Sequence, residues 1–355
     1  MIKPLKNILV VRTDRIGDVI LTTPALAYLR QAYPKSKISL MVTPATVELV
    51  DGNPYLDEVI VYDRQEKDKG PIRFWKFIFA LRKKKFDCAI VYHTKKRTNL
   101  ICFLAGIPER VGYHNNKFGF LLTKKIQDDR PLGTKHEAQY CLDLLEALGI
   151  KATNYMNLHV PIKTRNEMWV KQFLVEHNIK GQDLFIAIHP GGSDETKRWP
   201  PEKFAELIGL IREKYSVRMM LIGGLETQEI ADAIKSSCRW PFMDAVALTT
   251  VGQLVCLLRQ SCLLISNDSG PVHIASAVGT PVISIFGHRS GGISHTRWRP
   301  LGQKAFAIHR DQGCEECAQS DEESCLSCLQ AIEAREVFRA VESLISLPER
   351  SKSEA

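Results

Sequence analysis

The sequence predicts an α/β protein of two domains, each built on a parallel sheet covered by helices. Its 355 residues exceed what one ordinary core organises and suit two domains of about 150–180 residues. Short apolar runs alternate with stretches of helical period, which favours doubly wound sheets. This alternation pauses over Leu158–Arg165, which contains Pro161, and then restarts. We therefore expect domains at residues 1–165 and 166–355, with parallel sheets that face a cleft.

The first half supplies four apolar runs and three helical stretches. The runs predict buried parallel strands at Asn7–Thr13, Ile38–Val42, Glu58–Tyr62 and Asp87–Tyr92. Apolar residues recurring at three- to five-residue intervals predict helices at Asp18–Tyr33, Phe74–Lys85 and His136–Leu148. Gly149 is expected to end the last of these helices.

The second half repeats the alternation. Strands are predicted at Leu184–His189, Val217–Ile222, Cys262–Ser266 and Pro281–Phe286. Helices are predicted at Pro201–Lys214, Glu226–Lys235, Val251–Arg259, Pro271–Val278 and Ile332–Ser346. No fixed-period repeat is present, which excludes a solenoid.

The composition is that of a folded globular protein, with 45% hydrophobic and 25% charged residues. No apolar run approaches the roughly 20 residues that cross a bilayer. The segment Met1–Lys6 leads directly into the first strand without the apolar core of a signal peptide. We therefore expect a cytoplasmic protein whose ten cysteines are mostly reduced.

Charge is distributed unevenly along the chain. Residues 1–165 carry 28 Lys and Arg against 16 Asp and Glu, a net +12, whereas residues 166–355 carry 20 against 24, a net −4. This asymmetry indicates that the first half meets something anionic: nucleic acid, an acidic membrane surface or a phosphorylated acceptor. Lys-rich helix faces that only keep the protein soluble explain the same numbers equally well.

The first chemical motif, R-T-D-R-I-G-D-V-I from Arg12 to Ile20, follows the first strand directly. It places Gly17 at a tight turn and Asp18 at the start of a helix. It lacks G-x-G-x-x-G, so the usual dinucleotide fingerprint is absent. Asp18 is either an N-cap or first-turn residue that interacts with the helix dipole, or a general base aimed into the cleft.

A second motif, H-P-G-G-S-D-E-T-K-R-W-P from His189 to Pro200, has the composition of a phosphate cradle. Gly191 and Gly192 allow backbone N–H groups to approach an anion, Ser193 adds a hydroxyl, and Lys197 adds a positive charge. The competing interpretation is a polar surface loop that leads into a helix beginning at Pro200–Pro201.

Two further motifs follow strands of the second half. In S-N-D-S-G-P-V-H-I-A from Ser266 to Ala275, Ser269, Gly270 and the helix N-terminus offer donors to a phosphate, and His273 lies one turn further on. In G-G-L-E from Gly223 to Glu226, an acidic residue after two glycines suits ribose hydroxyls. Taken singly, His273 could be a helix residue whose polar atoms are hydrogen-bonded within the fold, and Glu226 could be only the first residue of its helix.

The order of these motifs resembles glycosyltransferase family 9, the ADP-heptose:lipopolysaccharide heptosyltransferases. The matching segments are R-x-G-D-V at Arg15–Val19, E-R-V-G-Y at Glu109–Tyr113, H-P-G-G-S…K-x-W at His189–Trp199, G-G-x-E at Gly223–Glu226 and D-S-G-P-x-H-x-A at Asp268–Ala275. The resemblance covers nearly the whole chain. It implies the GT-B fold, with two Rossmann-like domains, and transfer from a nucleotide-activated heptose with inversion and without a metal or other cofactor.

The resemblance also implies roles for individual residues. Asp18 takes the position of the catalytic base, with Gly17 beside it in the substrate-binding loop. Lys197 contacts the donor phosphates, and Glu226 lies near the ribose. The remaining donor-binding positions are Gly192, Ser193, Asp268, Ser269, Gly270 and His273. The implied partners are an ADP-sugar donor, a lipid-linked anionic saccharide of the lipopolysaccharide inner core or a similar glycolipid, and, transiently, the inner face of the cytoplasmic membrane, but no nucleic acid.

The cysteines fall into two groups. Cys314, Cys317, Cys325 and Cys328 form two C-x-x-C pairs, which is typical of a zinc or iron–sulfur site but equally compatible with free thiols or a disulfide. In either case catalysis is not expected to depend on them. The others lie in apolar patterns and are predicted to be core residues: Cys88, Cys102, Cys141, Cys238, Cys256 and Cys262.

Other functions remain open at this point. A nucleotide-sugar epimerase or hydrolase on the same fold would use the donor motifs without an acceptor. A non-catalytic carbohydrate- or nucleotide-binding protein would keep the second-half motifs but have no use for Asp18. Nucleic-acid binding suits the basic half, but no aromatic-interleaved or zinc-finger pattern accompanies the charge.

Overall fold

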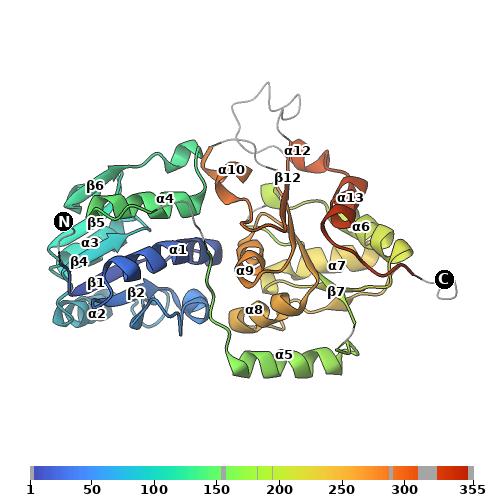
Figure 1. Cartoon of the computed structure of the whole chain (residues 1–355), viewed down its shortest axis with the longest axis horizontal. Coiled ribbons are helices and arrows are strands. Elements are labelled where there is room, and N and C mark those ends of the chain that lie inside the picture. The colour runs from blue at the N-terminus through green and yellow to red at the C-terminus, as the bar shows by residue number, and fades with distance from the viewer. Residues whose placement is uncertain are drawn as a thin grey trace. The chain divides into compact units, whose positions relative to one another are not determined.

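The computed structural model describes residues 4–152, 157–181, 183–193, 195–287, 291–310 and 326–350. The chain divides into two compact units, one of residues 1–131 and 135–161 and one of residues 132–134 and 162–355. Each unit contains a six-stranded sheet whose strands all pair in parallel, with helices packed along it (Figure 1). The predicted α/β class is therefore confirmed. No helix in the described part of the chain has the length and apolarity that a membrane crossing requires.

The sheet of the first unit has the order β3-β2-β1-β4-β5-β6. Its strands are β1 (Asn7–Val11), β2 (Lys37–Val42), β3 (Glu58–Val61), β4 (Cys88–Val91), β5 (Glu109–His114) and β6 (Lys124–Gln127). β1 and β4 are neighbours, with Val11 opposite Val91, and the strand order reverses between them. Ligands of such sheets bind beyond the carboxyl ends of the strands at this reversal. Here those ends lead into Arg12 and His93.

The helices of this unit differ in part from the predicted ones. They are α1 (Ile16–Ala32), α2 (Pro71–Lys83), α3 (Lys96–Leu104) and α4 (Glu137–Asp143), with 3₁₀ segments at Pro44–Leu49, Gly119–Leu121, Arg130–Leu132 and Leu144–Leu148. The single helix expected at His136–Leu148 thus changes to 3₁₀ geometry after Asp143. It ends at Gly149, whose φ of 78° is left-handed, as a terminating glycine requires.

The sheet of the second unit has the order β12-β11-β10-β7-β8-β9. Its strands are β7 (Phe185–His189), β8 (Arg218–Leu221), β9 (Met243–Asp244), β10 (Leu263–Asn267), β11 (Val282–Ile285) and β12 (Ala305–Ile308). Its helices are α5 (Thr164–Glu176), α6 (Pro201–Lys214), α7 (Gln228–Ser237), α8 (Val251–Gln260), α9 (Gly270–Val278), α10 (His295–Trp298), α12 (Leu326–Gln330) and α13 (Ala334–Leu344). Shorter 3₁₀ turns are at Glu195–Lys197, Leu225–Thr227 and Gly291–Ile293.

Trp199, a residue of the second motif, is part of the hydrophobic core of the second unit. Trp199 is fully buried, packs edge-on against Phe204 at 4.8 Å between ring centroids, and donates its indole N–H to the carbonyl of Ile332 at 2.9 Å. A buried indole needs such an acceptor, because an unpaired donor in the core is costly. Trp199 therefore fixes the loop that precedes α6.

Helix α1 contains a proline that rearranges its hydrogen bonds. Pro24 has no N–H, so the carbonyl of Ile20 loses its usual helical donor. The hydroxyl of Thr23 donates to that carbonyl at 2.6 Å and accepts the backbone N–H of His159 at 3.0 Å. The segment that closes the first unit is thereby attached to the helix that carries Asp18.

Candidate functional site

The first cluster of candidate residues lies where β1 passes into α1. Asp18 is the third residue of α1 and lies in its first turn, while Arg15 is the N-cap and no side chain caps the helix start, so the N-cap alternative is wrong and the first-turn position near the helix dipole holds. Gly17 is buried in the same turn without the positive φ of a glycine-specific turn. The expectation that Gly17 makes a tight turn possible was therefore wrong.

Arg12 organises this cluster. Its guanidinium is 1% exposed, and Nη2 lies 2.6 Å from Oδ1 of Asp18 and 2.8 Å from Oε1 of Glu137, which is equally buried. Its Nε donates to the backbone carbonyl of Asp18 at 3.1 Å. One buried cation thus orients the Asp18 carboxylate, whose side chain keeps 16% exposure. A carboxylate held in place and still reached by solvent suits a general base.

Asp14 adds a third carboxylate to the same guanidinium. Its Oδ1 lies 3.2 Å from Nε of Arg12, an ion pair without hydrogen-bond alignment. Burial raises the pKa of Asp14 to about 7, with Asp18 and Glu137 adding to the rise and Arg12 opposing it. Since one cation cannot compensate three carboxylates, Asp14 holds a proton far more readily than an ordinary aspartate.

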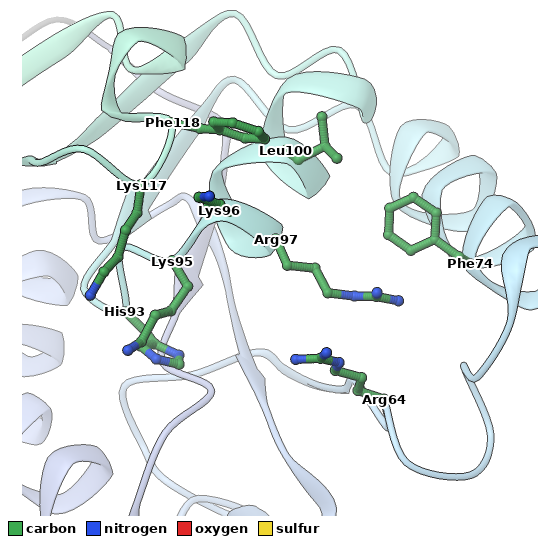
Figure 2. A pocket seen from close by; sticks show the side chains of 9 residues that line it. All are labelled: Arg64, Phe74, His93, Lys95, Lys96, Arg97, Leu100, Lys117 and Phe118. Atoms are coloured by element: carbon green, nitrogen blue, oxygen red, sulfur yellow. The ribbon is translucent and has the colours of Figure 1, made fainter.

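Next to this cluster, a basic pocket opens beyond the carboxyl end of β4. It has a volume of about 710 Å³ and is lined by Arg64, Phe74, His93, Lys95, Lys96, Arg97, Leu100, Lys117 and Phe118. Figure 2 shows Arg64 and Arg97 extending into the same space, with Lys95 and Lys117 close to His93. An adjoining cavity of about 420 Å³ shares four of these residues and reaches Thr13. The hydroxyl of Thr13 is 2.9 Å from Nδ1 of His93, which connects the pocket to the Asp18 loop.

The pocket concentrates positive charge that the protein itself does not neutralise. Among the described residues, none of its five Lys and Arg side chains forms an ion pair. Burial and then the charges of Arg12 and Lys95 lower the pKa of His93 to about 3, so its ring is neutral. Burial and then Lys117 lower the pKa of Lys95. Cations that disfavour one another in this way would gain from a bound phosphate or carboxylate.

In the second unit, the structure brings several predicted donor residues together. Nζ of Lys197 pairs with Oδ2 of Asp268 at 2.5 Å, and both side chains are about nine-tenths buried. Oγ of Ser269 lies 3.0 Å from Nδ1 of His189, whose pKa burial lowers to about 4. Gly270 is the first residue of α9, so the N-terminal backbone donors of that helix adjoin this pair.

Asn267, a residue of the third motif to which the sequence assigned no role, connects the loop after β7 with the loop after β10. The Asn267 amide donates to the carbonyls of Pro190 and Gly191 at 2.7 and 3.2 Å and accepts the backbone N–H of Trp199 at 3.1 Å. A Cβ at Gly191 would lie 2.8 Å from the Thr227 hydroxyl, so that position has no room for a side chain. The loop after β7 is therefore held rigidly against β10.

The remaining predicted residues differ in their burial. Gly192 sits against Lys197 and accepts two long contacts, 3.4 Å each, from Arg198, while Ser193 is exposed. His273 is 2% exposed, with its ring 6.3 Å from that of Trp298. Glu226 is exposed in a 3₁₀ turn, and its carboxylate folds back over Gly224.

The cysteine predictions have mixed outcomes. Cys314, Cys317 and Cys325 lie outside the described residues, and Cys328 is buried. The core assignment is confirmed for Cys88, Cys102, Cys141 and Cys256, whereas Cys238 and Cys262 are only partly buried and pack against the core of the second unit from its edge. Cys262 lies just before β10, where its Sγ also reaches the Phe185 carbonyl at 3.1 Å.

Sequence reasoning missed the partners of Asp18 and the lining of the basic pocket. Glu137 lies 125 positions from Arg12, and no local pattern relates them. The pocket residues come from four separate segments, at residues 64, 74, 93–100 and 117–118. The net positive charge of the first half was the available signal, and it indicated an anionic partner without indicating where that partner would bind.

Comparison with known proteins identifies the family of the chain. A family model described as glycosyltransferase family 9 (heptosyltransferase) matches residues 74–326. The chain is 26% identical to lipopolysaccharide heptosyltransferase 3 of Escherichia coli K12, over 95% of this chain and 97% of that protein.

Two solved structures extend the comparison. A family 9 glycosyltransferase of Veillonella parvula superposes with a TM-score of 0.82 at 26% identity, covering 97% of this chain and 98% of that one. The E. coli heptosyltransferase WaaC with ADP-2-deoxy-2-fluoro heptose gives a TM-score of 0.65 at 19% identity, covering 95% and 99%, and shows the shared fold. The fold is GT-B, and the chain belongs to glycosyltransferase family 9, the heptosyltransferase family.

Proposed function

We propose that this glycosyltransferase moves a heptose from ADP-heptose to an anionic acceptor of the lipopolysaccharide inner core, or of a similar glycolipid, with inversion and without a metal. The observation that carries the proposal is the Asp18 carboxylate, held by buried Arg12 next to a pocket of unpaired cations. Relatives named lipopolysaccharide heptosyltransferases, at 25–26% identity, support the heptose and the acceptor class.

The acceptor is assigned to the first unit. Arg64, Lys95, Arg97 and Lys117 would bind its phosphate or carboxylate groups, because charge-assisted contacts to such groups are strong and Arg can make them bidentate. Asp18 then accepts the proton of the attacking hydroxyl as its oxygen forms the bond to the anomeric carbon. The bond from that carbon to the phosphate oxygen breaks, and ADP leaves.

The donor is assigned to the second unit. Lys197 and the backbone donors at the start of α9 would stabilise the departing diphosphate, with Ser269 adding a hydroxyl. Glu226 would accept hydrogen bonds from the ribose hydroxyls, and His273 with Gly192 and Ser193 would complete the sugar and phosphate contacts. A lipid-linked acceptor would bring the protein to the inner face of the cytoplasmic membrane.

The decisive experiment separates donor binding from transfer. Asp18→Asn keeps the shape and a hydrogen-bond acceptor for Arg12 but removes the base, so transfer from ADP-heptose should slow by roughly 10²–10⁴-fold. Affinity for ADP, measured by calorimetry, should stay within a few-fold. Asp129→Asn, an exposed carboxylate of the same unit, is the matched control and should leave both unchanged.

Two results would contradict the proposal. Transfer by Asp18→Asn within a few-fold of the wild type would remove Asp18 as the base. A panel of sugar nucleotides in which ADP-heptose gives no selective thermal stabilisation would remove the donor, because a ligand that binds the native state must raise its melting temperature.

A further inference from the structure

Helix α2 (Pro71–Lys83) has two apolar faces, only one of which is covered. Ile78 and Leu81 are buried, and Phe74 and Phe77 pack beside them on the core of the first unit. This face accounts for how the helix is anchored. The opposite face has no such role in the fold.

On that opposite face, Ile72, Trp75 and Phe79 are 72%, 46% and 57% exposed. Their spacing of three and four residues aligns them along one side of the helix, and the rings of Trp75 and Phe79 are 6.2 Å apart. We call these three residues the α2 stripe. Large apolar side chains exposed together in this way mark an interaction surface more often than single exposed residues do.

Cations border the α2 stripe on both sides. At 100° per residue, Lys76 and Lys83 fall on one side of it and Arg82 on the other. No acidic residue occurs from residue 71 to residue 86. Within the described residues, none of these three side chains is in an ion pair. Trp and Phe flanked by Lys and Arg are the pattern of a helix that lies in the interface of an anionic bilayer.

The charge argues against the other occupants. A second copy docked through the same stripe would bring the cationic borders of the two helices together, since such an interface is self-complementary. Acidic lipid headgroups would instead pair with every border cation while the three apolar side chains enter the acyl boundary.

Phe74, on the same helix, also lines the basic pocket, with the guanidinium of Arg97 4.7 Å from its ring centroid.

We propose that the α2 stripe and its bordering cations dock the protein onto an anionic membrane surface, which places the basic pocket beside lipid headgroups. The choice of a membrane rests in part on the proposed lipid-linked acceptor. The docking itself requires neither donor nor acceptor, so it can be tested separately.

The test is flotation of the full-length protein with vesicles of phosphatidylcholine containing about a third phosphatidylglycerol. The double variant Trp75→Ser with Phe79→Ser should lower the partition coefficient roughly tenfold or more, because two interfacial aromatic side chains are lost. Met168→Ser with Val175→Ser is the matched control. These residues are 66% and 68% exposed on α5 of the second unit, where Glu167 and Glu176 adjoin them, and binding should not change.

Two more variants separate insertion from attraction. Trp75→Phe should still bind vesicles, but the blue shift of tryptophan emission seen with the wild type should disappear, which identifies Trp75 among the five tryptophans. Lys76→Gln with Lys83→Gln should weaken binding to the anionic vesicles and leave the weak binding to pure phosphatidylcholine as it was.

Three outcomes would overturn the inference. One is equal flotation of the serine double variant and the wild type. Another is a blue shift that persists in Trp75→Phe. The third is a combination of two results: the wild type does not float with vesicles, and it forms a concentration-dependent dimer in sedimentation that the serine double variant does not form. If the proposed function alone fails, flotation still depends on the stripe. If docking alone fails, donor binding and the Asp18 dependence remain intact.

Discussion

Replacing Asp14 by Asn should stabilise the first unit, and the gain should grow as the pH rises. The reason is the imbalance at Arg12, whose single buried charge faces Asp14, Asp18 and Glu137. Asp14 makes the weakest of the three ion pairs with Arg12. Its Oδ1 lies 3.2 Å from Nε of Arg12 without hydrogen-bond alignment, whereas the carboxylate oxygens of Asp18 and Glu137 lie 2.6 and 2.8 Å from Nη2. Asn keeps the size of the side chain and removes the third negative charge.

The sign follows from the proton equilibrium. The pKa of Asp14 is raised to about 7 in the folded protein, so the folded state binds this proton more tightly than the unfolded chain does. The stability it contributes is present at low pH and is lost as the pH rises from about 4 to about 7. Asn cannot ionise and loses nothing over that range. Since Asp14 keeps some exposure and shares its protons with its neighbours, we expect a gain of about 1–2 kcal/mol at pH 8.

Hydrogen exchange measured peptide by peptide at pH 5 and pH 8 is the suitable assay, because it keeps the first unit separate from the second. After correction for the intrinsic exchange rate, peptides of β1 and α1 should be better protected in the variant at pH 8, and the difference from the wild type should be smaller at pH 5. Asp63→Asn is the control with the opposite sign. Backbone donors lower the pKa of Asp63, so its stabilisation is present above its unfolded pKa and lost in acid, and its replacement should reduce protection at pH 8. An Asp14→Asn variant that is less stable at pH 8 than at pH 5, relative to the wild type, would refute the reasoning.

The other predictions concern the ligands. Lys197→Ala should weaken ADP binding by roughly 10- to 150-fold, because a contact of 1.5–3 kcal/mol is lost and the buried Asp268 carboxylate is left facing the phosphates; unchanged affinity in calorimetry would remove Lys197 from the donor site. Arg97→Gln should raise the KM for an anionic acceptor and make that KM less dependent on salt, while the affinity for ADP stays the same. A changed ADP affinity with an unchanged acceptor KM would show that Arg97 does not bind the acceptor. A chelator should leave transfer intact, and if a structural metal is present it should lower only the melting temperature; elemental analysis without metal would exclude the zinc alternative for Cys314, Cys317, Cys325 and Cys328.

Much of the fold could be predicted from the sequence because its strands are apolar and its helices have clear ends. Helix α6 begins and ends at the predicted residues, since Pro200–Pro201 fix its start. Elements without those signals were missed. β6 (Lys124–Gln127) alternates half-buried and exposed residues at a sheet edge, and α5 begins at Thr164, within the segment expected to be a linker. Neither has a long apolar run.

The candidate site could be predicted where its residues follow a strand and not where they meet across the chain. Lys197 and Asp268 were assigned to the donor from two separate loops, and they lie in contact. Their mutual neutralisation was not foreseeable, because a motif gives residue types and no distances. The sequence shows Arg12 only as a basic residue that follows the first strand, and it predicts no role for this residue. Its burial depends on Glu137, which only the packing of α4 against α1 brings near.

The two-sided hydrogen bond of Thr23 determines where the first unit can be cut. Its hydroxyl replaces the donor that Pro24 lacks, and it also accepts the N–H of His159, while Val160 is buried. A fragment that stops at Gly149 would lack the hydrogen bond from His159 to Thr23 on α1 and would expose the apolar surface that Val160 covers. A truncation that separates the two units, or a fusion that joins the first unit to the second unit of another family member, should therefore place the junction after Pro161. A junction placed earlier would loosen the helix on which Asp18 depends.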